Sequence, residues 1–335
     1  MRIAIVESTH WHLPLYLDAL GVPGLRVVGI TDSAEKTGAA LAKRFGCEVY
    51  RNLDNLLDMQ TVDFAFVFGR HIDMPTLAGK LIERGIPFAI EKPCGIRAID
   101  VDRLGASAEA KNLYVAVPMI FRMSDTLDIV GHTKTRPDFA SFRFMTGPPS
   151  RYEAAGTPWM LRFDLAGGGP LINLGVHFID LFSVLARDEI VSVSAVSSSE
   201  INGLSIEDVI SVRMVTKQNR IGTLECGYIF PSDNKIQREF TFSISSQDSY
   251  YASGDDQILV RSKSADGQIE TRRIPARLET DVYYPLFVRR VLDEVRAGSV
   301  PVAGLRDASR ALRIVEAAYL SASRHGMPIQ LNALP

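Results

Sequence analysis

Residues 1–120 alternate short apolar runs with segments of helical spacing, and this alternation constrains the fold more than any other feature. The runs are rich in Val, Ile and Phe without polar alternation, which is typical of strands buried on both faces of a parallel sheet. They lie at residues 3–6, 26–31, 64–68, 87–90 and 113–117. Segments 33–45 and 74–84 have helical spacing and stop at Gly46 and Gly85, as C′ glycines do. The pattern predicts an α/β domain with right-handed crossovers and a doubly wound parallel sheet.

The pattern changes beyond residue 120, where strand candidates follow one another without intervening helices. After a strand at 141–146 and a helix at 171–186, these strands lie at residues 190–197, 209–216, 221–228, 240–245 and 257–260. Two helices, 282–297 and 305–325, close the chain. We predict that residues 121–335 form an α+β domain with a large, open, mostly antiparallel sheet. Helices should cover one face, and the other face is a candidate interface for a homodimer or homotetramer, because a large apolar face must be covered.

Composition excludes several classes of partner. The chain has 37 basic and 39 acidic residues and a net charge of −2, so no nucleic acid or anionic membrane is expected as a partner. Its three cysteines are odd in number and form no Cys-x-x-Cys pair, which favours reduced thiols in a cytoplasm over disulfides or a zinc site. The apolar run at residues 2–6 is too short for a signal peptide, and we expect no membrane span.

The turn after the first strand lacks the glycines of a dinucleotide-binding loop. In such loops, Gly-x-Gly-x-x-Gly lets bare backbone approach the pyrophosphate. Here Glu7, Thr9 and His12 fill the three glycine positions, and a carboxylate at the first of them would repel a pyrophosphate. Ser8 and Thr9 still offer hydroxyl groups that can donate hydrogen bonds to phosphate.

Asp32 ends the second apolar run. An acidic residue at this point can bind a ribose 2′-hydroxyl, which favours NAD over NADP. Alternatively, Asp32 or Ser33 caps the following helix. The sequence leaves both interpretations open.

Lys92 lies in the segment Glu91-Lys92-Pro93, directly after an apolar strand. Ligands of open α/β sheets bind at this carboxyl edge. A lysine held there beside Pro93 is partly desolvated and can stabilise negative charge that develops on a reacting oxygen. A loop lysine on the surface is the alternative, and we favour the functional interpretation.

Asn173 and His177 are spaced i, i+4 and therefore share a face of the helix that follows Gly167-Gly168-Gly169-Pro170. A neutral histidine can accept the proton of a substrate hydroxyl. Asn173 can orient a substrate or the imidazole but cannot accept a proton. A histidine that only packs its helix is the alternative.

Three histidines, His10, His12 and His71, fall at predicted carboxyl ends of strands. A His-x-His pair with a carboxylate can bind zinc, so a metal site is one interpretation. We favour polar lining of a ligand cleft and predict no metal.

Together these motifs resemble the glucose–fructose oxidoreductase, inositol dehydrogenase and MocA (Gfo/Idh/MocA) oxidoreductase family. The resemblance covers the whole chain, and the motifs that carry it lie in residues 85–93, 115–122, 167–180 and 304–323. It implies an N-terminal Rossmann domain and a C-terminal α/β domain that binds substrate and forms oligomers. It also implies reversible hydride transfer between NAD(P), with NAD favoured, and a sugar, polyol or related small hydroxylated substrate.

The resemblance also implies residue roles. Lys92 would contact the reacting oxygen, His177 would act as acid and base, and Asn173 stands where many members carry an aspartate. The residues that we assign to cofactor binding are Ser8, Thr9, His10, Asp32, Phe68, Glu91, Lys92 and Pro93. Those that we assign to substrate binding are His71, Arg122, Trp159, Asn173 and His177.

Three departures from the family pattern identify a divergent member: the substituted glycine loop, Asn173, and Met74 in a place where a histidine is common. They leave two alternative functions open. One is a non-catalytic relative that binds a ligand or a partner as a regulator. The other is a metal-assisted lyase or hydrolase that uses His10, His12 and His71.

Overall fold

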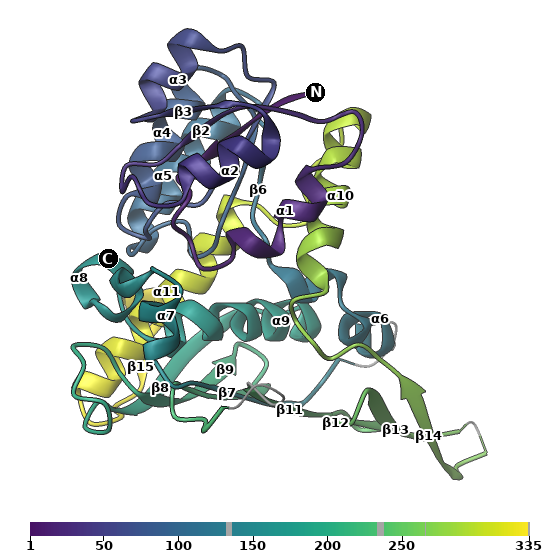
Figure 1. The fold of residues 1–335 in the computed structure, drawn as a ribbon. Helices are drawn as coiled ribbons and strands as arrows, with labels where there is room; N and C mark the ends of the chain where they lie inside the picture. The colour runs from purple at the N-terminus through teal and green to yellow at the C-terminus, as the bar shows by residue number, and fades with distance from the viewer. Residues whose placement is uncertain (132–135, 233–237, 265, 334–335) are drawn as a thin grey trace. The chain divides into compact units, whose positions relative to one another are not determined.

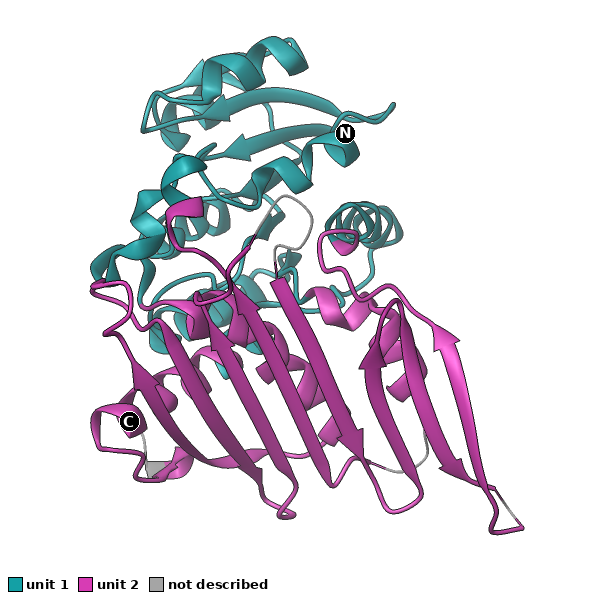
Figure 2. Ribbon diagram, turned by 60° about the horizontal axis from the view of Figure 1, so that its bottom comes forward, with its two compact units in different colours: residues 1–119, 152–167, 284–310 teal, residues 120–151, 168–283, 311–335 magenta. Residues whose placement is uncertain are grey.

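The computed structural model describes residues 1–131, 136–232, 238–264 and 266–333, and the chain forms two compact units (Figures 1 and 2). The first unit comprises residues 1–119, 152–167 and 284–310, and the second comprises residues 120–151, 168–283 and 311–335. The first unit therefore takes in two segments that lie beyond residue 120.

A parallel sheet forms the core of the first unit. Its strands are β1 (Arg2–Val6), β2 (Arg26–Thr31), β3 (Glu48–Tyr50), β4 (Phe64–Val67), β5 (Phe88–Ile90) and β6 (Val115–Ala116). Within the described residues they form six strands in the order β3-β2-β1-β4-β5-β6, and all their pairings are parallel. The predicted doubly wound sheet is confirmed.

Most helices of the first unit lie in the connections between its strands, and the last two in chain order come from the two later segments. They include α1 (Leu17–Leu20), α2 (Gly38–Phe45), α3 (Leu53–Met59), α4 (Met74–Glu83), α5 (Ala98–Ala110), α8 (Phe163–Ala166) and α10 (Tyr283–Ala297). The prediction that the second helix begins at residue 33 was wrong. Residues 33–37 instead wrap around the Asp32 carboxylate, which accepts the N–H groups of residues 36–38, so α2 begins at Gly38.

A broad sheet forms the second unit (Figure 2). Its strands are β7 (Phe139–Thr146), β8 (Ile190–Ser198), β9 (Val209–Thr216), β10 (Ile221–Gly227), β11 (Arg238–Ser245), β12 (Ser249–Gly254), β13 (Gln257–Lys263), β14 (Ile269–Pro275) and β15 (Ile329–Gln330). Among the described residues, nine strands lie in the order β14-β13-β12-β11-β7-β10-β9-β8-β15. Only β7 and β10 pair in parallel there, which confirms a mostly antiparallel sheet.

Helix α9 (Val176–Ala186) packs on one face of this sheet. The Phe178 ring lies 5.6 Å from the rings of both Phe142 and Phe144. A Cβ at Gly222 would lie 2.8 Å from the Phe182 ring, so the sheet can approach α9 this closely only at a glycine. The other helices with residues in this unit are α6 (Asp125–Gly131), α7 (Ser150–Ala154) and α11 (Leu305–Ser323).

The opposite face of the central strands mixes polar side chains with the apolar Phe139, Val215 and Ile221, so it is not the large apolar face that was expected. Its partly or fully exposed side chains include Ser141, Arg143, Ser211, Arg213, Thr223 and Glu225. Arg143 pairs with Glu225 at 2.9 Å and with Glu239 at 3.0 Å, so charges on this face are neutralised across strands. Self-association through this face would bury these paired charges together with a few apolar side chains.

Residues 163–186 form a helical stretch that is long and apolar enough to cross a membrane by length and composition. We expected no membrane span from the sequence. Within it, 83% of the most apolar window is buried inside the protein, as in a core helix.

Candidate functional site

Lys92 follows β5 at the carboxyl edge of the first sheet, and its side chain is fully buried. Burial lowers the pKa of the Lys92 ammonium to about 8, although the neighbouring Glu91 carboxylate acts in the opposite direction. The surface-lysine alternative is therefore wrong. A desolvated ammonium at this edge is suited to hydrogen bonding a reacting oxygen and to stabilising charge on it.

Glu91 is held by a network of buried side chains. Its carboxylate accepts a hydrogen bond from the Tyr16 hydroxyl and another, 3.1 Å long, from Nδ1 of His12. The Tyr284 hydroxyl lies 3.3 Å from the same Nδ1 atom. Burial raises the pKa of Tyr16, so the hydroxyl stays protonated and donates a hydrogen bond to Glu91. This network fixes the backbone just before Lys92.

The substituted glycine loop folds back onto β2. Glu7 adopts a left-handed conformation with φ +64°, which is the conformation that a glycine adopts most easily. Its carboxylate accepts hydrogen bonds from the Thr31 hydroxyl at 3.0 Å and the Ser33 hydroxyl at 2.6 Å. The Glu7 carboxylate is therefore held by hydrogen bonds within the loop region. The Ser8 hydroxyl is also engaged, at 2.8 Å from that of Thr37.

Asp32 binds the backbone at the start of α2, but it is not the N-cap that one interpretation had predicted, because α2 begins at Gly38 with Thr37 in the N-cap position. Its Oδ2 accepts N–H groups from Lys36, Thr37 and Gly38 at 2.6–2.9 Å. Its Oδ1 is buried and has no hydrogen-bond partner among the described residues. Oδ1 leaves one acceptor for a ribose hydroxyl, so binding of the ribose by Asp32 stays a prediction.

His10, His71 and Trp159 pack together after β1 and β4. The His71 and Trp159 rings lie 5.0 Å apart, and the His10 ring lies 5.8 Å from Trp159 and 6.2 Å from His71. All three side chains are buried. Phe68 contributes a further ring 6.3 Å from that of His10. The structure thus brings together residues that the sequence assigned separately to cofactor and substrate.

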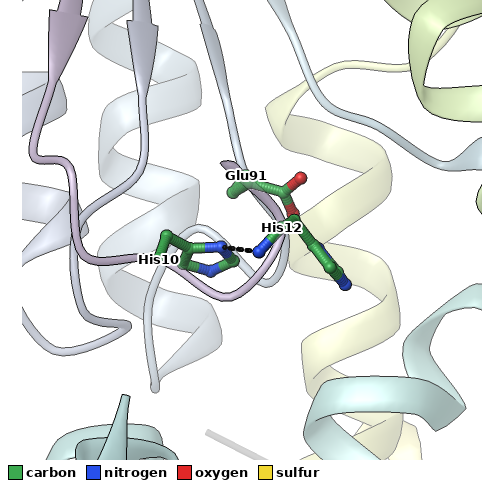
Figure 3. A group of neighbouring side chains, drawn as sticks. All are labelled: His10, His12 and Glu91. Atoms are coloured by element: carbon green, nitrogen blue, oxygen red, sulfur yellow. Dashed lines mark hydrogen bonds and ion pairs between the residues drawn. The ribbon is translucent and has the colours of Figure 1, made fainter. Parts of the chain in front are cut away.

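His10, His12 and Glu91 lie close enough for one ligand atom of each to bind a common metal ion (Figure 3). This trio differs from the predicted trio, in which His71 stood in place of Glu91. The backbone N–H of His12 donates to Nδ1 of His10 at 3.1 Å, which fixes the His10 proton on Nε2. His10 could ligate a metal only after breaking this bond or moving that proton. The His12–Glu91 hydrogen bond would also have to break, so the geometry disfavours a metal.

The second unit positions the helix that carries Asn173 and His177. Glu207 accepts the backbone N–H groups of Gly169 at 2.8 Å and Leu171 at 3.0 Å, and it also accepts the Tyr319 hydroxyl at 2.8 Å. A Cβ at Gly168 would lie 2.0 Å from that hydroxyl oxygen. The glycine run is therefore required by close packing against Glu207 and Tyr319.

Asn173 lies in a π-helical segment (Leu171–Gly175) that continues into α9, and His177 lies in the first turn of α9. Both side chains are buried. The Asn173 amide donates to the Tyr228 hydroxyl at 2.8 Å. Single π-helical turns inside helices often occur at functional sites. The roles of both residues in catalysis stay predictions.

Arg122 binds Asp180 through two hydrogen bonds of 2.6 and 2.8 Å. Asp180 lies one turn beyond His177 on α9, and the carboxylate is buried. This pair fixes α9 against residues 120–123. Contact between Arg122 and substrate stays a prediction.

Comparison with known proteins decides the family. Residues 11–119 match the family described as oxidoreductase, NAD-binding Rossmann fold, and residues 138–248 match the GFO/IDH/MocA C-terminal domain. Together the two matches span more than half of the chain. The chain belongs to the Gfo/Idh/MocA oxidoreductase family.

Individual relatives within the Gfo/Idh/MocA family are distant in sequence. D-apiose dehydrogenase from Paraburkholderia graminis is 22% identical over 348 residues, covering 96% of this chain and 87% of the relative. An oxidoreductase from Agrobacterium radiobacter, in complex with NAD+, L-tartaric acid and magnesium, has a TM-score of 0.84 at 16% identity, with 99% of each chain covered. An aldose-aldose oxidoreductase from Caulobacter crescentus, complexed with glycerol, has a TM-score of 0.77 at 17% identity and covers 98% of this chain and 99% of its own. The structural likenesses show a shared fold.

Sequence reasoning missed three residues that organise the site in this member of the Gfo/Idh/MocA family. Tyr16 binds Glu91, Tyr228 binds Asn173, and Glu207 binds the start of the helical segment that carries Asn173 and His177. Each lies far from its partner in sequence, so no local motif marks it. The Gly167-Gly168-Gly169 run was the available signal, because adjacent glycines indicate close approach by another element.

Proposed function

We propose that this chain is an NAD-dependent oxidoreductase that moves a hydride between NAD and a CH–OH carbon of a sugar, polyol or related small hydroxylated substrate. The observation that carries the proposal is Lys92, fully buried at the carboxyl end of β5 with its pKa lowered to about 8. Family membership and the dehydrogenase activity of the D-apiose relative support the reaction class. NAD, when bound at this sheet edge, supplies the hydride acceptor.

The residues present fit a dinucleotide. Strand order reverses between β1 and β4, which is where open α/β sheets bind their ligands. Asp32 Oδ1, His10 Nε2 and His71 Nε2 are buried polar atoms without a partner among the described residues, and all three belong to loops at this edge. We assign cofactor binding to this edge, with Ser8, Thr9, Phe68, Glu91 and Pro93 around it. We propose NAD over NADP because Glu7 and Asp32 both place carboxylates near the end of β2.

Proton transfer is assigned to the second unit. When hydride leaves a carbon, the hydroxyl on that carbon must lose its proton. We propose that His177 accepts this proton, that Asn173 orients the substrate, and that Lys92 hydrogen-bonds the same oxygen. Arg122 completes the proposed substrate-binding set, together with His71 and Trp159 at the sheet edge, where cofactor and substrate would meet. Residues 1–120 and 121–335 are the proposed cofactor and substrate domains.

The proposal extends to location and assembly. The three cysteines are free thiols, two of them buried, which supports a cytoplasmic location. We propose a homodimer or homotetramer through the open sheet face of the second unit. In such an assembly the pairing of Arg143 with Glu225 and Glu239 would keep the charges of this face neutralised.

Calorimetric titration of the purified protein with NAD, NADH and NADPH tests the proposal, once carried-over cofactor has been excluded. We expect binding of NADH in preference to NADPH, followed by nicotinamide-linked turnover on a panel of sugars and polyols. Absence of binding in folded protein would overturn the proposal. It would favour a non-catalytic relative in which the left-handed Glu7 and Asn173 replace the residues of an active enzyme.

A further inference from the structure

The hydrogen bonds of His10 fix where its proton lies. Nδ1 of His10 accepts the backbone N–H of His12 at 3.1 Å, so Nδ1 carries a lone pair and the proton is on Nε2. The His10 side chain is buried, and its Nε2 has no partner among the described residues. His10 therefore presents an unused N–H donor.

His71 has the opposite arrangement. Its Nδ1 lies 2.8 Å from the carbonyl oxygen of Ala166, which can only accept, so Nδ1 carries the proton. Nε2 of His71 then holds a lone pair, and this atom too is buried without a partner among the described residues. His71 therefore presents an unused acceptor, on a ring 6.2 Å from that of His10.

The two neighbouring rings together offer one donor and one acceptor, which match a ligand group that carries one acceptor and one donor. We propose that His10 and His71 bind the carboxamide of the cofactor's nicotinamide ring, with His10 donating to the amide oxygen and His71 accepting from the amide nitrogen. The buried Trp159 ring, 5.0 Å from that of His71 and 5.8 Å from that of His10, packs beside both histidines. The inference rests on the proposed function and changes one assignment in it, because it gives His71 to the proposed cofactor and not to the substrate.

The pair selects a neutral group. Burial lowers the pKa of His10 well below its ordinary value and that of His71 to about 3, so both rings are uncharged near neutral pH. Two neutral rings offer no charge to a phosphate or carboxylate, and the His71 lone pair would repel either. A primary carboxamide satisfies both atoms without bringing a charge into the site.

The fold places this pair where the nicotinamide half of a dinucleotide would lie. His10 follows β1 and His71 follows β4, and these neighbouring strands flank the point where strand order reverses. Asp32 follows β2 on the other side of β1, where the adenosine ribose is expected. The two histidines are thus on the β4 side, away from the adenosine half.

The test compares three probes on one protein by calorimetry: NADH, reduced 3-acetylpyridine adenine dinucleotide, and ADP-ribose. The acetylpyridine analogue keeps the carbonyl oxygen but lacks the N–H that His71 would accept, and ADP-ribose lacks the ring. We expect the wild type to bind NADH about tenfold more tightly than the analogue, because an unmet buried acceptor costs about that factor. His71→Phe should abolish this preference and leave ADP-ribose binding unchanged. His10→Phe should weaken NADH and the analogue equally.

Two further variants guard against misfolding. His71→Gln keeps an acceptor at a similar reach and should restore part of the preference for NADH. His325→Asn replaces an exposed histidine in the second unit and should change nothing. The inference is overturned if the wild type binds NADH and the analogue equally, if His71→Phe keeps the preference, or if ADP-ribose affinity falls as much as NADH affinity. If the wild type binds neither NADH nor ADP-ribose, the proposed function itself fails, which is a different result.

Discussion

Asn173 donates its side-chain N–H to the hydroxyl oxygen of Tyr228 at 2.8 Å, and both side chains are buried. An aspartate at this position, as in many members of the family, would instead accept a hydrogen bond from the Tyr228 hydroxyl and carry a negative charge. Such a charge on the helix that bears His177 would stabilise the imidazolium formed when the histidine takes up a proton. The wild-type arrangement therefore predicts a weaker base than the family's usual one.

We expect Asn173→Asp to raise turnover by about tenfold and to shift the acidic limb of the pH profile of kcat upward. Steady-state kinetics across pH would measure both. The double variant Asn173→Asp with Tyr228→Phe is the control, since it keeps the charge without the hydroxyl. An unchanged kcat together with an unchanged pH profile would show that Asn173 does not act through His177.

Lys92→Met should increase stability while removing activity. The unfolded chain keeps the lysine proton up to about pH 10.5 and the folded chain only up to about pH 8, so wild-type stability rises with pH between these values. The burial penalty, at most about 3 kcal/mol, is fully present below pH 8. Chemical unfolding at about pH 7 and about pH 10 should show a gain for Lys92→Met that shrinks at the higher pH. Turnover should fall about a hundredfold or more, because methionine cannot donate a hydrogen bond to the oxygen on which negative charge develops. A variant that is active and no more stable than wild type would contradict the assigned role.

Glu207 should control the geometry of the helical segment that carries Asn173 and His177. Glu207→Ala leaves the N–H groups of Gly169 and Leu171 without their carboxylate acceptor, and each such loss costs about 1–3 kcal/mol. Glu207→Gln keeps one carbonyl oxygen and should lose less. We expect kcat to fall in the same order while KM for the cofactor stays constant, because Glu207 belongs to the second unit. If both variants keep the kcat of the wild type, Glu207 contributes to stability alone.

Local sequence patterns predicted the elements that are buried along their whole length. Every residue of β4 (Phe64–Val67) is buried, so an uninterrupted apolar run marked it. Strand β3 (Glu48–Tyr50) has two exposed residues of three and left no such signal. The helix after β2 was placed five residues early, because its start depends on the Asp32 carboxylate and not on apolar spacing.

Site residues were predictable where position in a parallel sheet determines them. Lys92 could be assigned because a lysine directly after a buried strand must lie at the carboxyl edge. Glu207 could not, because its partners lie 36 residues away at Leu171 and 112 residues away at Tyr319. The metal trio was also wrong in one member, because strand ends show which side chains share an edge but not which of them touch.

No stoichiometric metal is expected at His10, His12 and Glu91. The bond from the His12 N–H to His10 Nδ1 fixes the proton on the nitrogen that would have to ligate. Elemental analysis of protein purified without a histidine tag would measure bound zinc, manganese and iron. His12→Ala should leave the measured metal content unchanged. One equivalent of metal that is lost in this variant would revive the lyase or hydrolase hypothesis.

Glu7→Gly restores the residue that a dinucleotide-binding loop normally carries at this point. Two effects on stability oppose each other: the left-handed backbone at φ +64° suits glycine by about 1 kcal/mol, and the hydrogen bonds to Thr31 and Ser33 are lost. We therefore expect a net loss of about 1–2 kcal/mol in the free energy of unfolding.

Cofactor affinity should respond to Glu7→Gly in the opposite direction. Removing a carboxylate from the pyrophosphate approach should tighten NADH binding by about tenfold, and more at low ionic strength. Glu7→Gln is the matched control: it removes the charge while keeping the side chain's bulk. Calorimetry at two salt concentrations separates the two causes. If Glu7→Gln reproduces the whole gain, charge limits binding. If only Glu7→Gly gains affinity, bulk and backbone conformation limit it. Unchanged NADH affinity in both variants would show that the bonds to Thr31 and Ser33 already keep the carboxylate away from the cofactor.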